Sequence, residues 1–412
     1  MAADLFAPLP LACGATLPNR IAKAATQEAL AGPGQLPDKH LFNAYARWSR
    51  GGSGLLLTGN VMIDGRACTG PADCVLEETT DLGPYREWAK ASKSGGAQVW
   101  MQINHPGRQV QADQGGEGWS ASDVPLDLGS ASKLFVKPRA MTEAEILETI
   151  GRFAATARLA DLAGFDGVQV HAAHGYLISQ FLSPLANHRT DRWGGSIENR
   201  ARLLVEAVKA VRAAVRPDFA VSVKLNSADF QRGGFDQDDA RAVVGYLNDL
   251  GVDLVELSGG SYESPAMQGE AADGRTLARE AYFLEFAIDL RKIAKMPLMC
   301  TGGVRRKEVA EQVLAGGVDV VGIATALSID PDLPKHWRAG GPDAPPAPKL
   351  KSKNKTLVSM GHMAFVVSQI GRMGKGQEPA PKASPLFALI GGQLARSGQV
   401  KRYRAWLSAQ KS

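Results

Sequence analysis

The sequence lacks the cysteine patterns of metal and redox centres. Its four cysteines, Cys13, Cys68, Cys74 and Cys300, form no CxxC pair, so neither a zinc site nor an iron–sulfur cluster has its usual ligands. Unpaired cysteines without a disulfide framework are typical of a reducing compartment. We therefore expect a cytoplasmic protein without a bound metal.

Long apolar runs are absent as well. No stretch of about 18 apolar residues occurs, which is the least that a membrane-spanning helix needs. The N-terminal segment carries Asp4 where a secretory signal has basic charge, and Pro8 and Pro10 interrupt its apolar residues. We expect neither a membrane span nor a cleaved leader.

The chain has only a small excess of positive charge. The 412 residues carry a formal net charge of +5, with a pI near 8.9, and are 44% hydrophobic and 22% charged. This is the composition of an ordinary globular protein, long enough for one large domain and an appendage. The basic surplus is too diffuse to predict a nucleic-acid partner, and an anionic cofactor or small-molecule substrate explains it equally well.

A short phrase of glycine, an apolar residue and aspartate recurs three times, each time before a Val-rich run. It occupies residues 164–166, 251–253 and 317–319. A left-handed glycine commonly ends a helix, and an apolar run of four or five residues is typical of a strand that is buried on both faces. The recurrence predicts repeated βα units.

Helix signals fill the gaps between these phrases. Thr142 and Glu145 form a capping box before apolar residues at helical spacing, and Asp236 opens a helix that Gly251 closes. Eight strands are predicted, at 21–25, 55–58, 98–102, 168–171, 221–225, 254–257, 298–301 and 320–322. Eight strands that alternate with helices predict an α/β fold of the (β/α)8 TIM-barrel class. The alternative is a doubly wound sheet, but neither GxGxxG nor GxxxxGK[ST] follows any strand.

Two stretches fall outside the repeats. Residues 111–141 follow the third strand and form either a lid over the barrel mouth or a plain surface excursion. The Pro-rich run 342–348 predicts a stiff linker, which divides the chain into a barrel domain, 1–340, and a linker with a helical C-terminal tail, 341–412. The tail's two helix-like pieces, 357–372 and 385–409, pack either on the barrel or on a neighbouring subunit of a homo-oligomer.

The most reactive cluster follows the fourth strand, where residues 171–176 read His-Ala-Ala-His-Gly-Tyr. In a barrel such groups gather at the C-terminal rim. His171 and His174 can together hold a carbonyl oxygen as negative charge develops on it, while the Tyr176 phenol keeps a proton to give as a general acid. The alternatives are polar residues that only stabilise a loop, or a pair of metal ligands.

The chain continues from residue 180 to residue 200 as QFLSPLANHRTDRWGGSIENR. Together with the His-x-x-His-x-Tyr cluster, this stretch closely resembles the signature of the Old Yellow Enzyme family of FMN-dependent ene-reductases. The resemblance extends from about residue 17 to about residue 331. It implies an NAD(P)H-dependent FMN oxidoreductase that reduces the activated C=C bond of an α,β-unsaturated carbonyl or similar compound. It assigns the substrate's activating oxygen to His171 and His174, and the proton donation to Tyr176.

The resemblance also implies residues for the flavin. Gln102 matches the amide that reads the pyrimidine edge, and Lys224 stands where the family usually carries an arginine against flavin N1 and O2. Ala25 ends the first predicted strand and Gln27 follows it, with Gln27 where relatives often have Thr or Cys beside flavin O4 and N5. Asn60, after the second strand, is expected at the same flavin edge or as a structural amide.

The phosphate-binding loops of the family match Gly303 after the seventh strand, and Ala324 with Thr325 after the eighth. The family usually has Gly-Arg where this chain has Ala324-Thr325, so one phosphate cation is missing. Arg305, Arg306 or a lysine of the tail are the candidates to replace it.

Two rival hypotheses stay open. One is a relative that reduces dienoyl thioesters, although this chain lacks the cysteine ligands of an iron–sulfur cluster. The other is a barrel that binds flavin or another phosphate ligand without turnover, which the departures at Thr325 and Gln27 favour. The triad of His171, His174 and Tyr176 favours catalysis, because a pure binder has no use for an acid.

Overall fold

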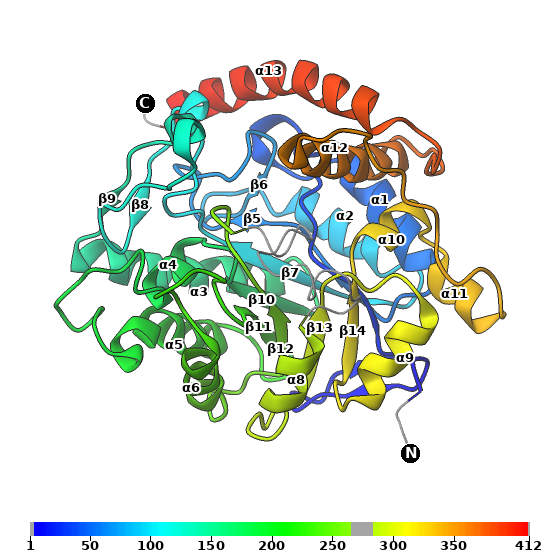
Figure 1. Ribbon diagram of the computed structural model, residues 1–412, viewed down its shortest axis with the longest axis horizontal. Helices are drawn as coiled ribbons and strands as arrows, with labels where there is room; N and C mark the ends of the chain where they lie inside the picture. The colour runs from blue at the N-terminus through cyan, green and yellow to red at the C-terminus, as the bar shows by residue number, and fades with distance from the viewer. Residues whose placement is uncertain (1–3, 265–282, 411–412) are drawn as a thin grey trace.

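The computed structural model describes residues 4–264 and 283–410. At its centre eight parallel strands form a barrel (Figure 1). They are β3 (Ile21–Lys23), β4 (Leu55–Leu57), β7 (Gln98–Asn104), β10 (Gly167–Ala172), β11 (Ala220–Asn226), β12 (Leu254–Ser258), β13 (Leu298–Thr301) and β14 (Val320–Ile323). Each pairs with the next in this order, and β14 pairs with β3, so the barrel closes. The predicted (β/α)8 barrel with a helical C-terminal extension is confirmed.

Helices cover the outside of the barrel, as the βα pattern requires. The longer ones are α1 (Lys39–Arg50), α2 (Gly83–Ser92), α3 (Glu143–Leu162), α5 (Ile197–Ala214), α6 (Gln237–Leu247), α8 (Leu284–Leu290) and α9 (Lys307–Ala315). Three short ones are α4 (Leu177–Leu182), α10 (Thr325–Ile329) and α11 (Leu333–Arg338).

The predicted N-terminal caps are confirmed, whereas α6 ends at Leu247, four residues before the Gly251 that was predicted to close it. The capping box of Thr142 and Glu145 opens α3, and the Asp236 side chain caps α6. The three repeated glycines, Gly164, Gly251 and Gly317, have φ angles of 87°, 67° and 88°, which is the left-handed conformation that a side chain disfavours. Three of the connections from a helix to the next barrel strand therefore contain a left-handed glycine.

Barrel side chains alternate between the helical shell and the barrel interior. We call the part of the interior at the N-terminal ends of the strands the lower half, and the part at their C-terminal ends the upper half. In the lower half the inward residues are apolar and fully buried, including Leu55, Trp100, Leu254 and Met299. A hairpin of β1 (Leu9–Pro10) and β2 (Thr16–Leu17) packs against them at the start of the strands. The sequence did not predict this hairpin, because strands of two residues have no pattern of their own.

Short elements decorate the opposite rim. They are η1 (Pro33–Gln35), β5 (Val61–Met62), β6 (Cys74–Val75), η2 (Ala112–Gln114), β8 (Trp119–Ser120), η3 (Gly129–Leu134) and β9 (Arg139–Ala140). β5 extends the sheet from the end of β7, and β8 contacts α4 directly after the fourth barrel strand. The insertion at 111–141 therefore lies at the C-terminal rim.

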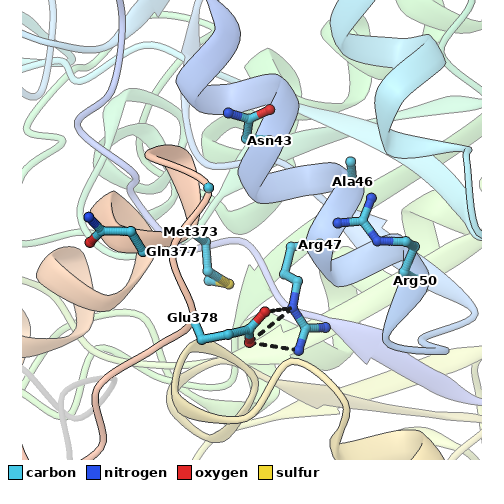
Figure 2. Close-up of a pocket in the computed structure, with 8 residues that line it drawn as sticks. Asn43, Ala46, Arg47, Arg50, Met373, Gln377 and Glu378 are labelled. Atoms are coloured by element: carbon cyan, nitrogen blue, oxygen red, sulfur yellow. Dashed lines mark hydrogen bonds and ion pairs between the residues drawn. The ribbon is translucent and has the colours of Figure 1, made fainter.

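The C-terminal tail packs on the barrel of its own chain. α12 (Lys355–Gly374) lies on α1 and α10, and α13 (Pro385–Ala409) runs along α12 and reaches η1 and η2 (Figure 1). Figure 2 shows a surface pocket where α1 meets the end of α12, in which Arg47 pairs with Glu378 at 2.9 Å. At the far end of α13 the Tyr403 hydroxyl donates to the carbonyl oxygen of Gly65 at 2.8 Å.

The division into two domains at residue 340 and the homo-oligomer stay predictions. Within 4–264 and 283–410, no helix is both long enough and apolar enough to cross a membrane.

Candidate active site

Polar side chains fill the upper half of the barrel interior. Gln102 on β7 lies in register with Gln169 on β10, and Lys224 on β11 with Glu256 on β12. Gln102 Nε2 donates to Gln169 Oε1 at 2.7 Å, and Gln169 Nε2 donates to Glu256 Oε2 at 2.8 Å. Lys224 Nζ lies 2.8 Å from Glu256 Oε1. A continuous chain of polar contacts thus crosses the barrel from β7 to β11.

The charge of Lys224 is compensated inside this chain. Its side chain is 4% exposed and that of Glu256 is 0% exposed, so the two opposite charges share a region of low dielectric. The sequence predicted the lysine but missed Gln169 and Glu256. Strand alternation was the available signal, because Gln169 shares the inward face with His171 and Glu256 shares it with Ser258.

His171, His174 and Tyr176 gather at the rim above this polar layer. The ring centroids of His171 and His174 are 5.1 Å apart, and those of His171 and Tyr176 are 4.8 Å apart. His174 and Gly175 both adopt left-handed backbone, with φ of 61° and 73°, so the chain reverses sharply where β10 ends. The reversal brings His174 Nε2 to 2.8 Å from Ser258 Oγ on β12.

Both imidazoles are held in the neutral form. Burial lowers the pKa of His171 and of His174 well below the usual value, and the positive charge of Lys224 acts in the same direction. The backbone N–H of Ala173 donates to His171 Nδ1 at 3.2 Å, so the proton of the neutral His171 ring resides on Nε2. Nε2–H of His171 is therefore a hydrogen-bond donor.

Tyr176 is held in the protonated form. Burial raises the pKa of its phenol well above the usual value, and Tyr262 adds to this effect, whereas a hydrogen bond with Asn60 opposes it. The hydroxyl oxygens of Tyr176 and Tyr262 are 3.2 Å apart. Tyr262 was not predicted, since it lies 86 positions further along the chain.

Several buried polar atoms at this rim have no hydrogen-bond partner among the described residues. They are Asn60 Oδ1, both amide atoms of Asn104, and Thr301 Oγ1. Leaving such a group without a partner costs about 1–3 kcal/mol. Amide donors and acceptors beside a hydroxyl suit a ring edge that alternates acceptors and donors, as the flavin pyrimidine edge does. The residues present therefore fit FMN.

The predicted residues after the first strand are partly engaged within the protein. Gln27 Nε2 donates to Asp73 Oδ1 at 2.8 Å, and Asp73 also accepts from the Gly70 backbone N–H. Burial raises the pKa of Asp73 to about 6. Ala25 is a half-buried neighbour of the lower apolar cluster.

The predicted phosphate loops lie next to each other, because β13 pairs with β14. Gly302 and Gly303 have φ of 145° and 75°, so both need the freedom of glycine. Ala324 precedes α10 and Thr325 begins it. Thr325 Oγ1 lies 3.3 Å from His362 Nε2, which belongs to the tail.

A further buried imidazole is structural. His105 stacks on Trp119 with ring centroids 5.9 Å apart, and burial lowers its pKa to about 4. Its Nδ1 accepts from the Gly107 backbone N–H at 3.0 Å. Among the described residues, no group of three or more His, Cys, Asp or Glu side chains could hold a metal ion.

Comparison with known proteins relates the chain to flavin enzymes. Residues 4–343 match the family described as NADH:flavin oxidoreductase / NADH oxidase. The NADH-dependent flavin oxidoreductase iliE of Hypocrea jecorina is 38% identical over 357 residues, which cover 81% of this chain and 89% of that protein. The protein of the same name from a Neonectria species is also 38% identical, over 88% of this chain but 51% of its own length. The chain thus spans about half of that relative.

Solved structures agree in fold. An old yellow enzyme homologue from Zymomonas mobilis superposes with a TM-score of 0.71 at 25% identity, covering 83% of this chain and 94% of that one. Morphinone reductase in complex with tetrahydroNAD gives 0.69 at 25% identity, with 84% and 93% covered. A complex of 2-naphthoyl-CoA reductase with 2-naphthoyl-CoA gives 0.76 at 28% identity, with 83% and 53% covered.

Proposed function

The chain belongs to the NADH:flavin oxidoreductase / NADH oxidase family, which includes Old Yellow Enzyme homologues and uses FMN with NAD(P)H, and from this premise we propose that it reduces the activated C=C bond of α,β-unsaturated carbonyl compounds or similar acceptors. When bound, FMN supplies the hydride chemistry between NAD(P)H and the substrate. The proposal depends on one observation above all, the meeting of two neutral imidazoles and a protonated phenol at one barrel rim.

The cofactor would be held by the polar layer and the rim. Gln102 and Lys224 are the groups for the pyrimidine edge, with Asn60 and Gln27 for the other edge of the ring system. Gly303, Ala324 and Thr325 belong to the phosphate end, where backbone N–H groups at a glycine turn suit an anion. Asn104, with both amide atoms buried and unpartnered among the described residues, joins this set.

His171 and His174 would bind the substrate's carbonyl oxygen. Neutral N–H donors in a buried site stabilise the negative charge that develops on this oxygen, and they need no reorganisation when it forms. His171 offers Nε2–H, since its Nδ1 already accepts from the backbone. His174 offers Nδ1–H if the Ser258 hydroxyl donates to its Nε2, so Ser258 is the positioning residue that selects this tautomer.

Tyr176 would protonate the α-carbon. Its raised pKa keeps the proton in place until the substrate carbon becomes basic. After transfer the phenolate needs donors, and the Tyr262 hydroxyl at 3.2 Å together with the Asn60 side chain can supply them. Tyr262 is therefore assigned as a supporting residue rather than as the acid.

An anaerobic titration tests this function. NADH or NADPH added to the purified protein should bleach the flavin absorbance, and 2-cyclohexenone should restore it. The saturated ketone cyclohexanone is the matched control and should leave the flavin reduced. An unchanged spectrum on addition of either nicotinamide would favour a flavin-binding barrel without turnover. Bleaching that no unsaturated carbonyl reverses would reject the C=C reduction.

An unsaturated thioester is a second candidate substrate. The similarity to 2-naphthoyl-CoA reductase, with a TM-score of 0.76, favours it, and His171 with His174 could hold a thioester carbonyl in the same way as a ketone. The same titration decides between the two. Faster recovery of the flavin absorbance with an unsaturated acyl-CoA than with cyclohexenone at equal concentration would favour the thioester.

A further inference from the structure

We propose that the C-terminal tail completes the binding site for the FMN phosphate, through His362 of α12 and Lys349 of the segment before it, acting with Arg305 of the loop after β13. The proposal rests on FMN as the cofactor of the proposed function. It assigns a cofactor-binding role to a part of the chain that lies beyond the matched family region at 4–343.

The starting point is the pair of glycines that ends β13. Gly302 and Gly303 both have positive φ, and successive backbone N–H groups in such a turn can point to one side and receive an anion. Thr325, at the end of the neighbouring strand β14, borders this turn because the two strands are paired. A glycine turn alone does not make an anion site, so the proposal depends on the side chains around it.

Arg305, two residues after the glycine turn, has a buried hydrogen-bond donor without a partner among the described residues. Its Nη2 donates to the carbonyl oxygen of Pro345 at 3.0 Å, which ties it to the linker. Its Nε is buried and has no hydrogen-bond partner in the described part of the chain. Arg305 also makes no ion pair with any described residue. A guanidinium with an unused buried donor is best satisfied by an oxyanion.

His362 contacts the end of the strand next to this turn. Its Nε2 lies 3.3 Å from Thr325 Oγ1. Arg305 and Lys349 lie near enough to His362 for their positive charges to add to burial in lowering its pKa. Lys349 is exposed and has no ion-pair partner among the described residues. His362 therefore borders the glycine turn through Thr325 and has two further basic side chains around it, and no described acidic group forms an ion pair with Arg305 or Lys349.

Such a cluster is unfavourable without an anion, because like charges repel. A phosphate monoester carries about −1.5 to −2 charges at neutral pH, which two permanent cations and one imidazole can offset. The contact of α12 with α10 holds His362 in place, and Figure 1 shows α12 lying over α10 at the edge of the barrel. Packing of the tail and affinity for the cofactor are therefore coupled.

Comparison of FMN with riboflavin tests the proposal, because riboflavin has the same ring system and no phosphate. Dissociation constants of both are measured on the flavin-free full-length protein, by the quenching of flavin fluorescence. We expect Arg305→Gln to weaken FMN binding by about tenfold or more, the range for a charge-assisted hydrogen bond, and His362→Ala by about threefold to tenfold, the range for an ordinary hydrogen bond. Riboflavin affinity should not change. Lys353→Ala, an exposed lysine of the same segment, is the matched control and should leave both affinities unchanged.

Other outcomes separate the hypotheses. Equal losses of FMN and riboflavin affinity, or no loss of either, in both Arg305→Gln and His362→Ala would overturn the role of the tail while leaving the proposed function intact. Failure of the wild-type protein to bind either flavin would instead overturn the proposed function itself. Riboflavin binding also serves as the folding control: if Arg305→Gln no longer binds riboflavin, the comparison is decided by His362→Ala.

Discussion

The two halves of the barrel interior follow opposite rules, although the same strands build both. In the lower half the inward side chains of Leu55, Trp100, Leu254 and Met299 are apolar and pack on the N-terminal hairpin. In the upper half they are polar, run from Gln102 to Lys224 through a buried ion pair, and lie beneath the His171, His174 and Tyr176 rings. Apolar burial stabilises the fold, whereas buried charges and unpartnered amides cost free energy. The lower half thus offsets the cost of a reactive upper half.

The largest effect on this comparison is expected from Trp100→Ala in the lower half. Trp100 is fully buried between the barrel and the hairpin, and removal of a buried aromatic side chain typically costs about 3–5 kcal/mol. Urea denaturation measures the loss. Leu134→Ala, at a site that is 60% exposed, is the control and should change stability by less than about 0.5 kcal/mol. Equal stability of the Trp100→Ala and Leu134→Ala variants would contradict the claim that apolar packing in the lower half stabilises the fold.

The dependence of folding stability on pH tests whether the buried histidines are neutral in the folded protein. The folded state holds His171 and His174 neutral, and it lowers the pKa of His105 to about 4. The unfolded chain, with a histidine pKa of about 6.5, therefore binds more protons below that pH, and stability falls as the pH falls from about 6.5 towards 4. His105 alone accounts for about 3 kcal/mol of this loss at pH 4. Asp73, with its pKa raised to about 6, acts in the opposite direction, gaining stability as the pH falls below 6.

Urea denaturation at several pH values between 7 and 4 measures the balance. The net change should be a loss, because four histidines, His105, His171, His174 and His362, have lowered pKa values, whereas two carboxyls, Asp73 and Asp229, have raised ones. His105→Gln should lose less stability over the same interval than the wild-type protein. A stability that rises steadily on acidification would show that the rings are not held neutral.

The ion pair of Lys224 with Glu256 tests the electrostatic role of the upper half. Glu256→Gln keeps the size of the side chain but leaves Lys224 without its counter-charge, so negative charge on the reduced cofactor should be better stabilised. The midpoint potential of the bound flavin should rise by about 30 mV, the equivalent of ~1.4 kcal/mol for two electrons. Equilibration with a reference dye measures it. A lower potential would mean that Lys224 does not act on the cofactor.

The smallest effect is expected from Ser258→Ala. It removes the partner of His174 Nε2 and with it the preference for one tautomer. The net loss should be about 1 kcal/mol, that of one neutral hydrogen bond, seen as a several-fold rise in KM for the unsaturated substrate with flavin reduction by NAD(P)H unaffected. Ser258→Thr, which keeps the hydroxyl, should restore most of the loss.

The parts of the fold that could be predicted are those with a local signal in the sequence. Three βα units carry a local glycine signal, such as Gly251 before β12, and the barrel strands are short apolar runs, so the eight strands were placed close to their observed bounds. The hairpin β1–β2 and the strands β5 and β6 were not predicted. Each of these strands is two residues long, which is too short for an alternating pattern in the sequence.

The candidate site divides in the same way. His171, His174 and Tyr176 lie within six positions of one another, and a signature follows them, so the sequence could predict that they gather. Gln169 and Glu256 could not be assigned, because their contacts with Gln102 and Lys224 depend on the register of strands that are far apart in sequence. The contact of His362 with Thr325 depends on the packing of the tail, for which the sequence holds no local signal.

The most direct test of the central claim is to measure the two half-reactions of Tyr176→Phe separately, by anaerobic stopped-flow absorbance. We expect flavin reduction by NAD(P)H to proceed at the wild-type rate, and reoxidation by cyclohexenone to slow by about 10²- to 10⁴-fold, the usual range for loss of a general acid. Tyr262→Phe should slow reoxidation far less. Reoxidation of Tyr176→Phe at the wild-type rate would contradict the assignment of the rim cluster as the catalytic centre.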